Sequence, residues 1–146
     1  MTDDDVRLHI LRELVARGAA PSVGDTGAAL GVSESDATAA YHRLAANKVI
    51  VLEPGTHGVL MAAPLSAVPT PHVARVADGR SHYGNCVWDA LGVMAMLGRD
   101  GEVETVCTDC GAPLTLTVRG GALAPTDAVV HFAVPAARWW ENIVFT

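Results

Sequence analysis

The sequence lacks the features that would direct it to a membrane or to nucleic acid. It holds no run of about eighteen apolar residues, and Met1 is not followed by a charged segment and a long apolar one, so neither a membrane span nor a secretion signal is expected. Basic residues are few: 10 Lys and Arg stand against 16 Asp and Glu, a net charge of −6. This charge has the wrong sign for binding a phosphate backbone. We therefore expect a cytoplasmic, globular protein without a nucleic-acid partner.

Cysteines are also scarce, at three, and all of them fall in the second half of the chain: Cys86, Cys107 and Cys110. An odd number in a reducing compartment disfavours a disulfide framework and favours metal binding or thiol chemistry. The sequence contains no Gly-rich phosphate loop, no Ser/His/Asp pattern and no dinucleotide fingerprint, which disfavours the enzyme classes that depend on them.

Residues 1–62 predict a winged-helix-like module of three helices and a hairpin. Val6, Ile10, Leu11 and Leu14 recur at helical spacing until Gly18, and "SVGDTGAALG" indicates a second, short helix. Ser33, three residues before Asp36, begins the third helix as a loose capping box. The segment "VIVLEPGTHGVLMA" then gives two strands around a Pro-Gly turn.

This module has the wrong charge for reading DNA. It carries five Lys and Arg against eight Asp and Glu. A DNA-reading winged helix needs cations at the start of its third helix, where this chain has Glu34 and Asp36. A packing or dimerisation role is favoured instead, and a homodimer is a candidate assembly.

The rest of the chain predicts an extended linker over residues 63–80, which contains three prolines, and an α+β module over 81–146. In the module, "NCVWDALGVMAMLG" indicates a helix that Asn85 can cap and that is buried on nearly all sides. Two strands flank the turn at residues 107–111. A further strand, "AVVHFAVP", precedes a short helix, "AARWWENI", and "IVFT" is a candidate closing strand. The expected sheet is small and mixed or antiparallel, with the helix packed on it.

Cys86 and Asp89 are the candidate catalytic pair. Positions i and i+3 of a helix share one face, so a proton could pass between the two side chains. The spacing suits a thiolate that attacks and an acid that delivers a proton. The alternative is structural: Cys86 is a small buried hydrophobe and Asp89 points to solvent or caps a helix.

Cys107 and Cys110 form a C-x-x-C at a Gly-containing turn, which is half of a zinc knuckle. No second pair exists, but Cys86 could supply a third sulfur and His82 or His131 a fourth ligand. The three cysteines are therefore candidate ligands for zinc, copper(I) or mercury. His131 lies in a predicted strand, where a core histidine is the commoner case.

The stretch "HYGNCVWDALGVMAMLGRDGEVETVCTDCGAPLTLTV", followed by "VVHFAVP" and a Trp-containing helix, resembles the alkylmercury lyases. The matching features are a tyrosine, Tyr83, just before the thiol; C-x-x-D at the start of an apolar helix; Cys107 ahead of Gly-Ala-Pro; and His131-Phe132 before Val-Pro. The resemblance covers residues 81 to 140.

The resemblance implies protonolysis of a carbon–mercury bond, in which two cysteine thiolates bind the mercury and an aspartate passes a proton to the carbon. Carried over, Cys86 is the thiol and Asp89 the proton donor, while Cys107 matches a structural cysteine. Tyr83 and Trp88 are the neighbouring candidates for substrate binding. No cofactor is required, and a bound metal ion would be mercury as product, or zinc or copper.

The sequence departs from the family at its second catalytic cysteine. Aligning His131 and Phe132 places Asp127 where the family has that cysteine, and no cysteine follows Cys110. The chain also ends soon after Trp140, without the family's C-terminal segment. Either Cys110 or Asp127 completes the site, or the activity has changed. The alternatives are a soft-metal binding protein, a metal-sensing regulator, and a lyase-fold enzyme that acts on a small organic metabolite.

Overall fold

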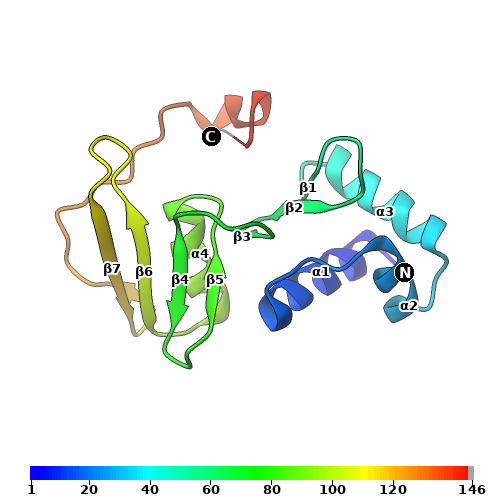
Figure 1. The fold of residues 1–146 in the computed structure, drawn as a ribbon, viewed down its shortest axis with the longest axis horizontal. Coiled ribbons are helices and arrows are strands. Elements are labelled where there is room, and N and C mark those ends of the chain that lie inside the picture. The colour runs from blue at the N-terminus through cyan, green and yellow to red at the C-terminus, as the bar shows by residue number, and fades with distance from the viewer. Residues whose placement is uncertain (145–146) are drawn as a thin grey trace.

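The computed structural model describes residues 1–144 and confirms the expected α+β class. The N-terminal half contains α1 (Asp3–Arg17), α2 (Val23–Leu30), α3 (Glu34–Ala46), β1 (Val51–Leu52), β2 (Val59–Ala62) and β3 (Leu65–Ser66). The C-terminal half contains β4 (Val73–Val76), β5 (Ser81–Tyr83), α4 (Val87–Leu97), β6 (Gly101–Val106), β7 (Pro113–Arg119), β8 (Ala122–Leu123) and the 3-10 helix η1 (Ala136–Glu141). Figure 1 shows the two halves side by side, with β3 between them.

The three N-terminal helices are present, and the first helix ends, the second ends and the third begins where the sequence indicates. Ser33 accepts a hydrogen bond from the Asp36 N–H at 3.1 Å and so caps α3. Gly18 and Gly31 end α1 and α2 in the left-handed conformation, where glycine carries no side-chain penalty. No helix within residues 1–144 is long and apolar enough to cross a membrane.

The segment predicted as an extended linker is instead part of both sheets. Strands β1, β2 and β3 form one antiparallel sheet. Strand β4 lies between β5 and β6 in a five-stranded antiparallel sheet of order β5-β4-β6-β7-β8. The alternating apolar residues of this segment, Ala74 and Val76, are buried. The prolines lie outside β3 and β4 and leave their ladders intact.

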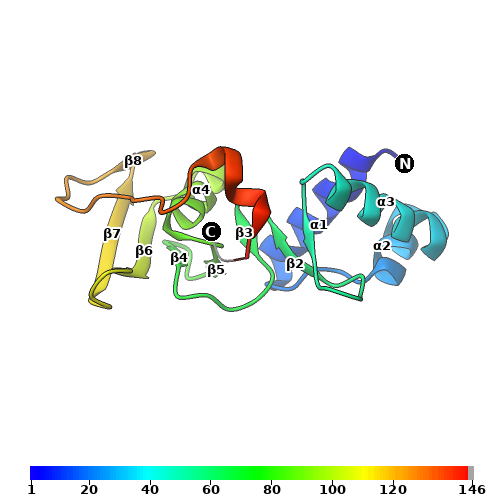
Figure 2. The ribbon, with the colours of Figure 1, turned by 90° about the horizontal axis from the view of Figure 1, so that it is seen from above.

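Helix α4 packs on one face of the five-stranded sheet, against β4 and β6 (Figure 2). Ala90, Val93 and Met94 are its buried residues. Trp88 and Met96 are exposed, so the expectation of burial on nearly all sides was wrong. Only one face of this apolar helix packs on the sheet, and the aromatic and thioether side chains of the other face lie in solvent.

The core of the protein is one continuous cluster that runs through both halves. It includes Ile10 and Tyr41 from the helices, Leu65 from β3, and Val93 and Val103 from α4 and β6. A β-bridge between Leu65 and Gly84 joins the two sheets. The N-terminal module is therefore packed against the sheet and is not tethered to it by a free segment.

The C-terminal segment differs most from expectation. Residues 128–135, all within the described chain, form no strand, and His131 is exposed and not in a core. Strand β8 pairs with only the last two residues of β7, Val118 and Arg119. The predicted short helix is present as η1. Residues 143 and 144 form a turn, and the last two residues of the predicted closing strand lie outside the described residues.

We expect Gly84→Ala to destabilise the protein and displace the start of α4. A Cβ at Gly84 would lie 2.4 Å from the Ala90 backbone nitrogen, so strand and helix would have to separate, at a cost of about 1–3 kcal/mol. Urea unfolding measures this. Gly24→Ala, in the first turn of α2 and with ordinary contacts, is the control and should be close to neutral. Equal stability of the two variants would contradict the close packing.

Acid should destabilise the fold through His82, which is 5% exposed with both ring nitrogens buried and unpartnered among the described residues. Burial lowers the pKa of His82 from its usual 6.5, and Arg80 lowers it further. Below pH 6.5 the unfolded chain therefore binds a proton that the folded chain does not, and stability falls as pH falls, by at most about 1.4 kcal/mol per pH unit. Urea unfolding across pH should show a shallower slope for His82→Leu, but not for His131→Leu at an exposed position.

Candidate active site

One end of the five-stranded sheet gathers the chemically active residues. Val73 of β4 pairs with Tyr83 of β5 and with Glu104 of β6, so these three residues lie in one row. Cys86 follows Tyr83 by three positions and Cys107 follows Glu104 by three. Because β5 and β6 both run antiparallel to β4, both cysteines lie beyond the same end of the sheet. They follow β5 and β6, which have β4 between them and are therefore about 10 Å apart.

Cys86 and Asp89 meet at the first turn of α4. Cys86 is the N-cap residue with an extended backbone, and Asp89 is the third helical residue. These are the positions of a capping box with a thiol in place of a hydroxyl, although the thiol makes no capping hydrogen bond. Asn85 was expected as the cap; instead its Nδ2 donates a hydrogen bond to Asp89 Oδ2 at 3.0 Å.

Burial favours the neutral form of both groups. It raises the pKa of the half-buried Cys86 thiol; the Asp89 carboxyl raises it further, while nearby backbone N–H groups lower it. Burial also raises the pKa of Asp89 above 3.8, against lowering by the Asn85 amide, the Cys86 thiol and His72. Since the two side chains interact directly, the pair can share one proton between sulfur and oxygen.

His72 is the third ionisable group of this site, just before β4. Its Nδ1 lies 2.7 Å from the Thr105 hydroxyl on β6. Burial lowers the pKa of His72, while the charge of Asp89 raises it. The ring is therefore held by β6 on one side and lies within electrostatic range of Asp89.

The Cys107–Cys110 turn connects β6 to β7 at the same end of the sheet. The Cys107 N–H donates to the Ala112 carbonyl at 2.8 Å, and the Gly111 N–H donates to the Cys107 carbonyl at 2.8 Å. Gly111 adopts φ 71°, which a turn this tight requires. The N–H groups of Cys110 and Asp109 and the Cys110 thiol lower the pKa of Cys107. Cys107 is half-buried and Cys110 is exposed, and both are free thiols.

The three cysteines do not form one metal site. Within residues 1–144, no group of three or more His, Cys, Asp and Glu side chains is placed to hold a metal ion. His82, a candidate fourth ligand, is enclosed in the core. Asp127 and His131 are exposed on the irregular segment after β8. Among the described residues the three sulfurs are therefore not gathered: the Cys107–Cys110 turn follows β6, the start of α4 follows β5, and β4 lies between these two strands.

Aromatic side chains lie beside the thiol and the carboxyl. Trp88, between Cys86 and Asp89 in the sequence, is 58% exposed. Its ring lies 6.3 Å from that of Phe132, which is 5.0 Å from Trp139. Tyr83 is also exposed, on β5. The segment after β8 thus returns to α4, as η1 does in Figure 2, and supplies an apolar surface next to this turn.

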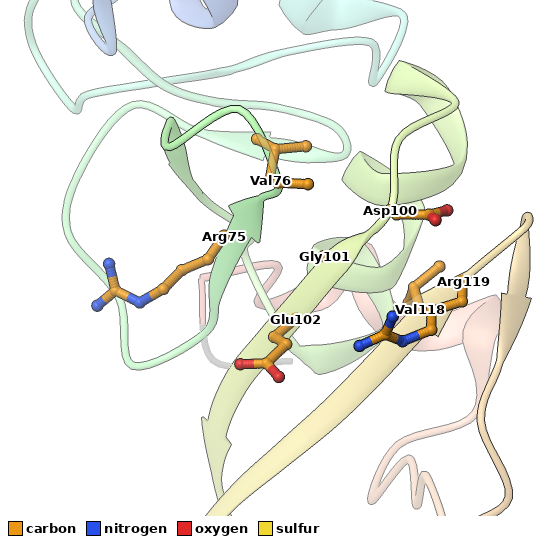
Figure 3. Close-up of a pocket in the computed structure, with 8 residues that line it drawn as sticks. Arg75, Val76, Asp100, Gly101, Glu102, Val118 and Arg119 are labelled. Atoms are coloured by element: carbon orange, nitrogen blue, oxygen red, sulfur yellow. The ribbon is translucent and has the colours of Figure 1, made fainter.

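A surface pocket at the opposite end of the sheet holds no thiol. Figure 3 shows its lining from β4, β6 and β7, with Arg75, Glu102 and Arg119 around it. Arg75 already pairs with Glu104. This pocket therefore offers none of the soft ligands that the sequence points to, and the end that holds Cys86 remains the candidate site.

Sequence reasoning missed two residues of the site. Asn85 precedes Asp89 by four positions, a spacing at which side chains on a helix can meet, so its bond to the carboxylate had a local signal. His72 had none. It lies in the segment taken as a linker, and only the pairing of β4 with β5 and β6 brings it near Asp89.

Known proteins share both this segment and the fold. A family model described as alkylmercury lyase matches residues 65–146. The alkylmercury lyase of Pseudomonas putida is 36% identical over 96 residues, or 60% of this chain and 45% of that protein. The lyase of Bacillus cereus is 33% identical over 81 residues, or 53% of this chain and 37% of that protein.

A crystal structure of the mercury-bound form of MerB2 has the same fold, with a TM-score of 0.66 at 23% identity over 84% of this chain and 60% of that one. The chain spans less than half the length of the two lyases above. The family model nevertheless covers more than half of the chain, including Cys86, Asp89 and both cysteines of the turn. The chain therefore belongs to the alkylmercury lyase family.

Proposed function

We propose that this protein cleaves carbon–mercury bonds by protonolysis, with Cys86 as the mercury ligand and Asp89 as the proton donor. One observation carries the proposal: a thiol and a carboxyl interact at the first turn of α4, and burial raises the pKa of both. A soft thiolate suits a soft metal, and a carboxyl that holds a proton more readily than usual suits a general acid.

The proton balance of the reaction follows from this pair. Between the two pKa values, Asp89 is a carboxylate and Cys86 a thiol. When Cys86 binds the mercury of an organomercurial thiolate, its proton passes to Asp89. Asp89 then protonates the carbon, the electron pair of the carbon–mercury bond forms the new C–H bond, and the hydrocarbon leaves. Hg²⁺ remains on Cys86 and the external thiolate, and Asp89 is again a carboxylate.

The neighbouring residues have positioning roles in this scheme. Asn85 holds Asp89 through its 3.0 Å hydrogen bond, and His72 favours the carboxylate that accepts the thiol proton. The exposed faces of Trp88 and Phe132 offer an apolar surface for the organic group. Cys110 and Asp127 were the two candidates for a second mercury ligand. Asp127 presents a hard oxygen, so a sulfur ligand is favoured. An external thiol supplies this sulfur without any movement of the Cys110 turn toward Cys86.

Cys86→Ser should abolish hydrocarbon release from an aryl mercurial in excess thiol, because serine does not ligate mercury at neutral pH. Asp89→Asn should retain mercurial binding but lower the single-turnover rate by about 100-fold or more, since a positioned acid contributes about 10²–10⁴. Gas chromatography of the released hydrocarbon measures both. Asp127→Asn is the matched carboxylate control and should match the wild type. No release by the wild-type protein would exclude the proposal.

The single-turnover rate should depend on pH as a bell. In acid the rate should fall as Asp89 becomes protonated, because a protonated Asp89 cannot take the thiol proton; this limb reports the pKa of Asp89, which lies above 3.8. The alkaline limb reports Cys86 and lies above 9.0, because above that pKa the pair has lost the proton that the carbon must receive. Stopped-flow measurement of the rate across pH tests this, and Asn85→Ala should move the acid limb upward. A rate that does not change over the whole range would contradict proton transfer by this pair.

A further inference from the structure

We propose that Cys107 and Cys110 form a two-sulfur site that takes the Hg²⁺ product from Cys86. The inference rests on the proposed function for the origin of the ion. It assigns a use to the one pair of thiols that the cleavage scheme leaves idle. The pair belongs to a turn whose backbone is fixed by its own hydrogen bonds and by the β6–β7 ladder.

The turn presents both sulfurs as a chelate. The two hydrogen bonds between Cys107, Gly111 and Ala112 close the loop, and Gly111 turns the chain back into β7. The Cys110 thiol interacts with the Cys107 sulfur. Both cysteines are free thiols, and Cys110 is exposed, so the pair is open to an ion from solvent.

A site of two sulfurs favours Hg²⁺ over Zn²⁺. No third His, Cys, Asp or Glu within the described residues joins the two sulfurs in a metal-holding group. A structural zinc ion needs four ligands, so this turn alone is a poor zinc site. Hg²⁺ is soft and is satisfied by two thiolates, and two sulfurs on one turn act at a high effective concentration, which favours them over separate monothiols.

The position of the turn suits transfer from Cys86. Both leave the same end of the sheet, with β4 between their strands. Thr105, two residues before Cys107, bonds to His72, which lies within electrostatic range of Asp89. The dithiol turn therefore begins close to His72, which borders the cleavage site, and its Cys110 side chain is exposed to solvent.

The transfer balances without an oxidant or reductant. The strands that carry the two sites are about 10 Å apart, so a second external thiolate carries the mercury between them. It attacks the mercury, the bond to Cys86 breaks, and a Cys86 thiolate is left. At the turn, the Cys107 thiolate then displaces one of the two external thiolates from the mercury. The Cys110 sulfur then forms the second Hg–S bond, and its proton leaves with the other external thiol. The products are Hg²⁺ on Cys107 and Cys110, a free Cys86, an external thiolate and an external thiol.

Titration of Hg²⁺ into reduced protein in a large excess of monothiol tests the site, with native mass spectrometry and the ultraviolet Hg–S absorption as readouts. Cys86→Ser should retain one Hg²⁺ per chain. Cys86→Ser combined with Cys110→Ser, a change at an exposed side chain, should bind about 100-fold more weakly or not at all. Equal binding by the two variants, or no binding by Cys86→Ser, would overturn the proposal.

Thiol mapping after a single turnover tests the transfer itself. Wild-type protein is given one equivalent of an aryl mercurial and then alkylated. Cys86 should be alkylated, while Cys107 and Cys110 should be protected by mercury. The reverse pattern would overturn the transfer. If the wild type releases no hydrocarbon, the proposed function fails, and the Hg²⁺ titration of Cys86→Ser still decides whether the dithiol site exists.

Discussion

The close approach of Gly84 to α4 sets the geometry of the candidate site. The N–H of Gly84 donates to the His72 carbonyl at 2.8 Å, and its carbonyl accepts from the Thr70 hydroxyl at 2.6 Å. With no side chain at this position, the first turn of α4 lies directly on the strand end. This contact fixes Cys86 and Asp89 beside His72. The same residue forms the bridge to Leu65 that joins the two sheets, so one glycine links the core, the interface of the two halves and the site.

Partial burial of the site has a direct chemical consequence. A fully exposed thiol and carboxyl would titrate near their usual values and would seldom share a proton at neutral pH. Here burial is the largest influence on both pKa values and raises both. The cost of burying each group is offset by their contact, by the Asn85 amide and by backbone N–H groups. The resulting pair holds one proton that mercury binding can displace from sulfur to oxygen, which is the step that protonolysis needs.

Local sequence signals predicted the parts of the fold that depend on local physics. The caps at Ser33 and Gly18, the short second helix and the strands around the Cys107 turn follow from hydrogen bonding and backbone preferences within a few residues. The pairing of Cys86 with Asp89 was predicted for the same reason. The strand at 73–76 was missed because it is short and follows a proline-rich stretch that resembles a linker. His72 could not be assigned, since its place depends on pairing between strands distant in sequence. The strand expected at 128–135 was wrong: Phe132 contacts the rings of Trp88 and Trp139 instead, and a local apolar alternation does not reveal such contacts.

The central claim is that mercury binds Cys86 while Asp89 delivers the proton. A crystal structure of Asp89→Asn soaked with an aryl mercurial tests this most directly, because the variant keeps the thiol but lacks the acid. The account predicts mercury on Cys86 Sγ with its carbon–mercury bond intact and the aryl group toward Trp88. Mercury on Cys107 and Cys110 with its aryl group already lost, and Cys86 free, would contradict it.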